Sequence, residues 1–141
     1  MTLPTTPLLA VDAIITRCRT NERKDTEILL IRRLNPPLGW ALPGGFVDIG
    51  ESAETAMMRE VKEEVGLTVV AYTKHDLYSD PLRDSRFHVA TMVYVVTQYN
   101  GNPLAGDDAK SLRWHRLDSL PECAFHHNEI IMDAVVEHEE I

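Results

Sequence analysis

The feature that most constrains the fold is the run RFHVATMVYVVTQY at residues 86–99, in which most positions are apolar or aromatic. A strand that faces water on one side alternates apolar and polar residues, whereas a strand buried on both faces reads as a nearly continuous apolar run. We therefore expect residues 86–99 to form a central strand of a sheet that is covered on both sides.

The other segments supply the rest of that sheet and its covering layers. Strand character recurs at residues 8–18, 28–33, 67–79 and 111–117. Prolines and glycines at 34–45 predict a loop with at most a short strand at 40–42, and Asn100-Gly101 favours a hairpin turn. Helices are expected at 52–65 and 127–139. One helix embedded among strands and another at the end predict an α/β fold, a single domain over residues 1–141 arranged as an α/β/α sandwich.

Charge and cysteine content limit the partners of the chain. The formal net charge is −8, which argues against a general electrostatic grip on nucleic acid. Cys18 and Cys123 lie far apart and form no CxxC motif, so we expect free thiols in a reducing compartment, the cytoplasm. No basic segment precedes the first apolar stretch. That stretch is broken by Asp12 and is too short to span a membrane, so no membrane partner is expected.

Three glutamates in the stretch REVKEEVGL, Glu60, Glu63 and Glu64, gather on one face of the helix expected at 52–65. Ser52 is a plausible N-cap residue of this helix, and Gly66 a plausible residue to follow its end. Like charges four residues apart repel each other. Two interpretations follow: the glutamates form a solvated acidic face, or they hold a hard cation such as Mg²⁺, Mn²⁺ or Ca²⁺.

The wider stretch GFVDIGESAETAMMREVKEEVGL, residues 45–67, resembles the signature of the Nudix hydrolases. That signature is glycine, five residues, glutamate, seven residues, Arg-Glu, an aliphatic residue, any residue, Glu-Glu, any residue, glycine and an aliphatic residue. Every fixed position is matched, by Gly45, Glu51, Arg59, Glu60, Val61, Glu63, Glu64, Gly66 and Leu67. The resemblance implies a Nudix-fold α/β/α sandwich with a mixed central sheet.

The resemblance also implies a role for each residue of the signature. Glu60 and Glu64 are the main ligands of Mg²⁺, for which Mn²⁺ can substitute, and Glu63 is a further ligand or the general base, so all three are catalytic candidates. The backbone carbonyl of Gly44 is a further metal ligand. Gly45 and Gly66 are structural positions, and Glu51 and Arg59 form an ion pair that ties the loop to the helix, unless Arg59 is simply exposed to solvent.

Three further segments resemble the ADP-ribose pyrophosphatases of this superfamily: residues 78–91, 105–110 and 124–131. The last departs from that pattern, because His126 stands where an acidic residue is frequent. The candidate substrate-binding residues in these segments are Arg83, Arg86, Asp107, Asp108 and His127. Their alternative roles are surface ion pairs for the arginines, turn chemistry for the aspartates and a polar helix cap for the histidine. Possible stacking partners for adenine, or simply core residues, are Trp40, Tyr78, Phe87 and Phe125.

We expect a Mg²⁺-dependent hydrolase of a small nucleotide, one that cleaves ADP-ribose to AMP and ribose 5-phosphate. The alternatives are a house-cleaning pyrophosphatase for NADH, other nucleotide sugars or oxidised nucleoside triphosphates and, more remotely, a non-catalytic sensor of ADP-ribose-type ligands. The resemblance alone also implies a homodimer.

Overall fold

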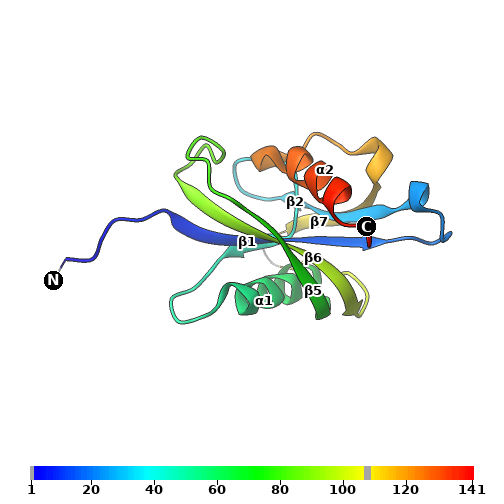
Figure 1. Cartoon of the computed structure of the whole chain (residues 1–141), viewed down its shortest axis with the longest axis horizontal. Coiled ribbons are helices and arrows are strands. Elements are labelled where there is room, and N and C mark those ends of the chain that lie inside the picture. The colour runs from blue at the N-terminus through cyan, green and yellow to red at the C-terminus, as the bar shows by residue number, and fades with distance from the viewer. Residues whose placement is uncertain (1, 107–108) are drawn as a thin grey trace.

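A computed structural model describes residues 2–106 and 109–141, so the predictions for Asp107 and Asp108 lie outside the described residues. The chain forms a sheet between two helices, α1 and α2, which lie on opposite sides of it (Figure 1). The helices and strands are β1 Leu8–Arg17, β2 Glu27–Arg33, β3 Gly39–Ala41, β4 Gly44–Phe46, α1 Ala53–Val65, β5 Thr68–Tyr78, β6 Val89–Asn100, β7 Ala109–Arg116 and α2 His127–Glu137. Short 3₁₀ turns occupy Arg23–Asp25, Leu117–Ser119 and Ala124–His126.

The long apolar segment forms the centre of the sheet, as predicted, although the strand begins at Val89 rather than at residue 86. The strand order is β3-β2-β1-β6-β5, and β6 pairs in parallel with β1 and antiparallel with β5, so the sheet is mixed. Tyr94 and Val96 of β6 join the hydrophobic core beneath α1, whereas Val93 and Val95 join the core beneath α2. Burial on both faces explains why this strand lacks the alternation of a half-exposed strand.

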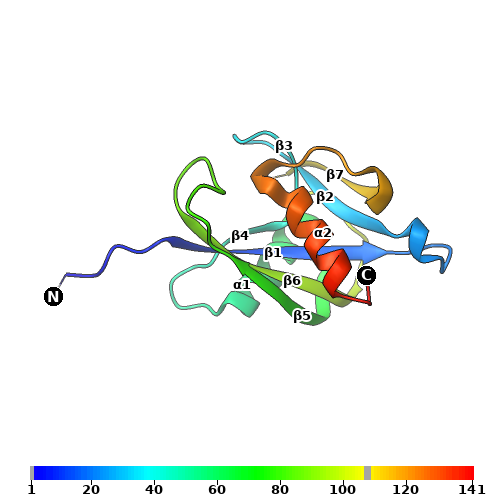
Figure 2. The ribbon, with the colours of Figure 1, turned by 45° about the horizontal axis from the view of Figure 1, so that its top comes forward.

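The N-terminal strand changes its antiparallel partner along its length. Its residues Ala10–Asp12 pair with β4, whereas Thr16 and Arg17 pair with β2. The strand β2 therefore diverges from β1 at the level where β4 takes its place (Figure 2). This fork leaves space between β2 and β4.

Two details of the strand prediction are wrong. Residues 34–45 were expected to hold at most one short strand, but β4 follows β3 directly and begins at Gly44. Gly101 has the positive φ of a turn residue, +105°, yet no hairpin forms there, because β7 pairs with β2 instead of β6. After Gly101 the chain runs past the end of α1, where the backbone N–H groups of Leu104 and Gly106 donate to its last carbonyls.

Both ends of α1 follow the prediction. The hydroxyl of Ser52 accepts a hydrogen bond from the backbone N–H of Thr55, and Gly66 ends the helix in the left-handed conformation at φ +75°. The apolar side chains Met57, Val61 and Val65 are fully buried against the sheet, which fixes the direction in which the glutamates point. Within the described residues, no helix is long and apolar enough to cross a membrane.

Candidate active site

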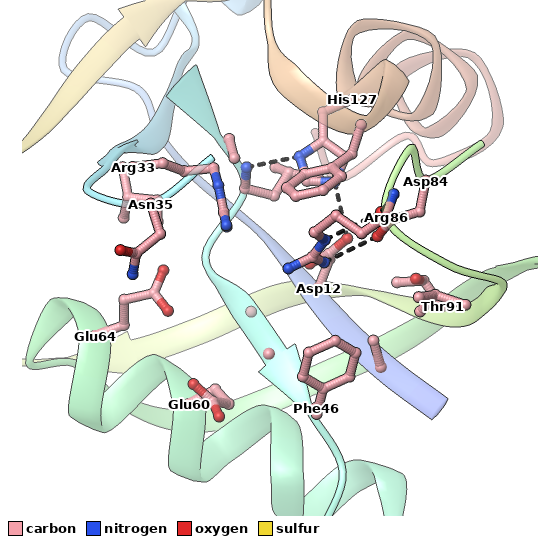
Figure 3. Close-up of a pocket in the computed structure, with 18 of the residues that line it drawn as sticks. Asp12, Arg33, Asn35, Phe46, Glu60, Glu64, Asp84, Arg86, Thr91 and His127 are labelled. Atoms are coloured by element: carbon pink, nitrogen blue, oxygen red, sulfur yellow. Dashed lines mark hydrogen bonds and ion pairs between the residues drawn. The ribbon is translucent and has the colours of Figure 1, made fainter. Parts of the chain in front are cut away.

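A cavity of about 350 Å³ opens at the fork between β2 and β4 (Figure 3). A volume of this size suits a small organic ligand. Its lining comes from every part of the fold around the fork: Ala10, Asp12, Ile31, Arg33, Leu34, Asn35, Ala41, Leu42, Gly44, Gly45, Phe46, Asp48, Glu60, Glu64, Arg83, Asp84, Arg86, Val89, Thr91, Phe125 and His127.

The glutamates of α1 divide into two groups. Glu60 and Glu64 line the cavity, and Figure 3 shows both projecting from α1 toward it. Their spacing of four residues places them on one face of the helix, and Glu64 is buried. Glu63 is not among the residues that line the cavity. Its side chain is 61% exposed and lies against Arg59.

The guanidinium of Arg59 connects the loop before α1 to the glutamates. Its Nε lies 3.0 Å from Oε2 of Glu51, and its Nη1 lies 2.9 Å from Glu60 and 3.1 Å from Glu63. The Nη2 group donates to the carbonyl of Phe46 at 3.1 Å. Arg59 is therefore not simply exposed to solvent: the expected pair with Glu51 is present, and the same guanidinium holds Glu60 in orientation.

The Glu51–Arg59 pair gives stability a predictable dependence on pH. Hydrogen bonds from Arg59, together with the backbone N–H of Asp48, lower the pKa of Glu51 from 4.5 to about 2. A group whose pKa is lower in the folded state stabilises that state above its unfolded pKa and loses this effect as the pH falls. The stabilisation by Glu51 should therefore be complete above about pH 4.5 and disappear as the pH approaches 2.

We expect Glu51→Gln to lower the unfolding free energy at pH 7, with the difference from the parent shrinking toward pH 3. Urea unfolding of both proteins across this range measures it. Glu139→Gln, which removes an exposed glutamate near the end of the chain, is the matched control. A difference that stays constant between pH 7 and pH 3 would contradict the assigned pair.

Two glycines of β4 bring the backbone close to both neighbours of that strand. A Cβ at Gly44 would lie 2.1 Å from the carbonyl oxygen of Val11 and 2.2 Å from Oδ1 of Asp12. A Cβ at Gly45 would lie 2.5 Å from the carboxylate of Glu60. The missing side chains therefore leave the space that Asp12 and Glu60 occupy, and expose the β4 backbone to the cavity.

The opposite wall carries positive charge and aromatic rings. The guanidinium of Arg33 lies 4.7 Å from the ring centroid of Phe125, and that of Arg86 lies 5.0 Å from the same ring. Burial, reinforced by the charge of Arg86, lowers the pKa of Arg33, and Glu64 opposes that shift. The two guanidinium groups beside one ring give this wall positive charge, which suits an anionic ligand. Phe125, whose ring lies at this wall, has a left-handed backbone conformation with φ +58°. A bulky residue adopts this conformation only at a cost in conformational energy.

The two predicted arginines differ in how they are held. Arg86 forms a two-pronged pair with Asp84, at 3.1 and 2.9 Å, so its ion-pair interpretation is correct even though it lines the cavity. Arg83 donates through Nη2 to the hydroxyl of Thr91 in β6. Its Nε is buried at the cavity and has no hydrogen-bond partner among the described residues. A buried charged donor at the cavity can donate to an anionic ligand.

His127 lies in the cavity wall rather than acting as a helix cap. Its Nδ1 accepts a hydrogen bond of 2.9 Å from the backbone N–H of Leu42, and its Nε2 lies 3.0 Å from Oδ2 of Asp12. Because Nδ1 accepts, Nε2 carries the proton and donates to Asp12. This chain of contacts joins the start of α2 to β1 and to the chain just after β3, and so fixes the back of the cavity.

The donor set fits a hard divalent metal ion. Glu60 and Glu64 present carboxylates to the cavity, the backbone of Gly44 faces the same space, and oxygen ligands are those that Mg²⁺ and Mn²⁺ prefer. The absence of a Cβ at Gly45 leaves room for the Glu60 carboxylate beside that backbone. Sequence reasoning missed Asp12, Arg33 and Asn35 as cavity residues. An aspartate inside an apolar strand was a usable signal, since a charge there requires a partner.

Comparisons with known proteins agree with this geometry. The NUDIX domain family matches residues 6–134. The ADP-ribose pyrophosphatase of Methanocaldococcus jannaschii is 45% identical over 129 residues, which are 90% of this chain and 72% of that protein. A MutT/nudix family protein from Enterococcus faecalis superimposes with a TM-score of 0.83 at 31% identity, over 97% of this chain and 64% of that one.

The NUDIX domain of Shewanella oneidensis NrtR, solved with ADP ribose, also has a TM-score of 0.83, at 26% identity over 94% of this chain and 89% of that chain. The family match covers most of the chain, the fold is shared with solved members, and Gly45, Glu60 and Glu64 of the signature line one cavity. The chain therefore belongs to the Nudix family, and it is a Nudix pyrophosphohydrolase.

Proposed function

We propose that this enzyme cleaves the pyrophosphate bond of ADP-ribose, giving AMP and ribose 5-phosphate, with Mg²⁺ as the cofactor. The observation that carries the proposal is a single cavity with two unlike walls. Carboxylates of α1 line one wall, and arginines and an aromatic ring line the other. The carboxylates would hold a metal ion that neutralises charge on a pyrophosphate, and the arginines and the ring would bind the rest of the substrate. The 45% identity to an ADP-ribose pyrophosphatase supports this substrate.

The residues of the cavity have distinct roles in this proposal. Glu60 and Glu64 hold Mg²⁺, which when bound neutralises charge on the pyrophosphate and lowers the pKa of a water molecule. Arg59 orients Glu60 through the contact at 2.9 Å. The carbonyl of Gly44 is a further ligand. Glu63 is a further ligand or the general base that accepts the proton of the attacking water; either role requires its exposed side chain to turn from Arg59 toward the cavity.

The second wall binds the part of the substrate beyond the metal. Arg83 offers its buried Nε to a phosphate or ribose oxygen, and Arg33 adds positive charge. The ring of Phe125, beside the guanidinium groups of Arg33 and Arg86, is a stacking partner for adenine once these side chains move from its face. The Asp12–His127 pair keeps this wall in place.

A hydrolysis panel with identified products tests the proposal. Purified enzyme is assayed with Mg²⁺ against ADP-ribose, NADH, other nucleotide sugars, dinucleoside polyphosphates and nucleoside triphosphates. We expect ADP-ribose to have the highest kcat/KM and to give AMP and ribose 5-phosphate. A preference of more than tenfold for a triphosphate would overturn the choice of substrate, and tight binding of ADP-ribose without product would instead identify a sensor.

The arginine wall gives a sharper prediction. Arg83→Ala should lower kcat/KM for ADP-ribose about 10- to 100-fold, because a charge-assisted hydrogen bond contributes about 1.5–3 kcal/mol. Arg86→Ala should have a smaller effect, since Asp84 already pairs with that side chain. Arg113→Ala removes an exposed arginine outside the cavity and is the matched control. The Mg²⁺ concentration for half-maximal rate should not change, and unaltered kcat/KM in Arg83→Ala would remove this residue from the site.

Two further proposals concern the cellular compartment and the oligomeric state of the enzyme. Cys18 and Cys123 are free thiols, which supports a reducing compartment such as the cytoplasm. A homodimer is proposed from the likeness to the subgroup, and sedimentation equilibrium of the full chain measures it.

A further inference from the structure

A second cluster of potential ligands lies away from the cavity, where the C-terminal end of α2 meets β5. It consists of His75 of β5, Glu137 at the last position of α2, and His138, the residue that follows the helix. Figure 2 shows α2 lying across the sheet, with its C-terminal end toward β6 and β5. None of the three lines the cavity, so the cluster has no place in the reaction proposed above.

The three side chains converge on one point. Nδ1 of His75 lies 3.0 Å from Nε2 of His138 and 3.2 Å from Oε2 of Glu137, and all three ligand atoms lie within 4.8 Å of one another. Neighbouring ligands of a tetrahedral zinc ion, with bonds of about 2.0–2.1 Å, are separated by roughly 3.3–3.4 Å. Two of the separations are thus within a few tenths of an ångström of those in a zinc site.

The direction of the surrounding hydrogen bonds determines whether the His75 nitrogen that faces this point carries a proton or a lone pair. The hydroxyl of Tyr78 donates to Asp133 at 3.0 Å, and burial raises the pKa of Tyr78 well above its usual range, so it remains a donor. The same oxygen, 2.9 Å from Nε2 of His75, therefore accepts the Nε2 proton. The neutral imidazole then has a lone pair on Nδ1, which faces Glu137.

His138 is arranged in the same way. Its outer nitrogen, Nδ1, lies 3.4 Å from Oε1 of Glu140, which favours the proton on that nitrogen and a lone pair on the inner Nε2. Each histidine is therefore oriented from outside by an oxygen acceptor, the arrangement that metal-binding histidines use to fix their tautomer. Two lone pairs and a carboxylate then face one another, an arrangement that a cation or a shared proton between them would stabilise.

We propose that His75, Glu137 and His138 form a binding site for Zn²⁺ or a cation of similar preference, with water completing a tetrahedral set. Imidazole nitrogens favour such ions over Mg²⁺, which distinguishes this site from the carboxylates of the cavity. The ion joins the end of α2 to β5, and so holds the helix whose first residue, His127, forms the back of the cavity. Its role is structural, because no residue of the cluster reaches the cavity.

The burial of the two histidine side chains distinguishes this site from a chance cluster of side chains on the surface. The side chain of His75 is 1% exposed and that of His138 is 13% exposed, whereas Glu137 is 59% exposed and leaves a path for an ion to enter. Without a metal, the alternative is a hydrogen bond between the two rings, with one proton shared. That alternative predicts no stoichiometric binding of Zn²⁺.

The test is titration of the chelator-treated full chain with Zn²⁺ by calorimetry. It is made in the Glu60→Gln/Glu64→Gln background, so that the two glutamates of the cavity do not compete. We expect one equivalent of Zn²⁺ to bind with a Kd below about 1 µM, and the melting temperature to rise by about 5 °C or more at a large excess over Kd. Co²⁺ in place of Zn²⁺ should give the strong visible absorption of a tetrahedral ion.

Three variants in the same background complete the test. His138→Gln should abolish the stoichiometric binding and the cobalt absorption, and Glu137→Gln should weaken binding at least tenfold. Glu139→Gln, an exposed glutamate two residues further on, is the matched control and should bind as the parent does. If His138→Gln does not fold, the result for Glu137→Gln tests the site instead. The Glu137 side chain is mostly exposed, so its substitution should leave the fold intact.

The proposal is overturned if the Glu60→Gln/Glu64→Gln protein binds no Zn²⁺ at 10 µM, a concentration about tenfold above the expected Kd. It is also overturned if adding Glu137→Gln to this protein leaves the affinity for Zn²⁺ equal to that measured with Glu139→Gln. Neither result bears on the hydrolysis of ADP-ribose, which is measured separately with the unmodified chain and Mg²⁺.

Discussion

Glu64→Gln is expected to lower kcat/KM for ADP-ribose by at least ~10²-fold while the protein remains folded. The amide has the size of the carboxylate, so the buried position remains filled, but the negative charge that holds Mg²⁺ is lost. Circular dichroism checks the fold, steady-state kinetics at saturating Mg²⁺ measure the rate, and calorimetry should show weaker binding of Mg²⁺.

Glu54→Gln is the matched control for this experiment. Glu54 lies in the first turn of the same helix and pairs with Lys74 at 3.2 Å, outside the cavity. We expect its kcat/KM to stay within about twofold of the parent, since surface pairs of this kind contribute little. A Glu64→Gln enzyme with a rate near that of Glu54→Gln at saturating Mg²⁺ would remove Glu64 from the metal site.

The adjacent glycines of β4 should respond in opposite ways to the same substitution. Gly44→Ala is expected to lower the unfolding free energy by about 3 kcal/mol, roughly 10 °C in melting temperature, because its Cβ meets the backbone of β1. Gly45→Ala meets only the end of the Glu60 side chain, which can move. We expect its melting temperature to stay within about 3 °C of the parent, but kcat/KM to fall about tenfold or more, since Glu60 leaves its position.

Thermal unfolding and kinetics of the two variants, measured side by side, test this contrast. Each glycine is the control for the other, because both substitutions add one methyl group to the same three-residue strand. Equal losses of stability in the two variants, with no loss of rate in Gly45→Ala, would show that the close approach to Glu60 has no part in the reaction.

The sequence predicted best those parts of the fold that depend on local chemistry. Ser52 and Gly66 mark the ends of α1 by hydrogen bonding and by a left-handed backbone, both of which act within a few residues. The strand β6 was evident because burial on both faces leaves a long apolar run. The hairpin predicted at Asn100-Gly101 does not form, for the opposite reason: Gly101 has the positive φ of a turn residue, but the pairing of β7 with β2 depends on residues far away in the sequence.

The residues of the cavity likewise differ in how far the sequence alone could predict that they lie together. Glu60 and Glu64 share one helix and one signature, so their proximity could be predicted from spacing alone. Arg33, Asp12 and Phe125 come from three distant segments, and only the fold brings them to one space. The exposure of Glu63 was not predictable either, because it depends on how Arg59 distributes its hydrogen bonds among three glutamates.

In the proposed reaction, the change of partner along β1 places the metal ligands on one side of the fork and part of the substrate wall on the other. The proposed metal-binding wall belongs to α1 and β4, which adjoin the first part of β1, whereas Arg33 and Phe125 belong to β2 and to the segment that bridges to β3 through Trp40 and Cys123. Substitutions of Arg33 or Phe125 are therefore expected to alter the choice of nucleotide more than the binding of the metal. Descendants of such a chain can acquire new nucleotide preferences while inheriting the same hydrolytic chemistry.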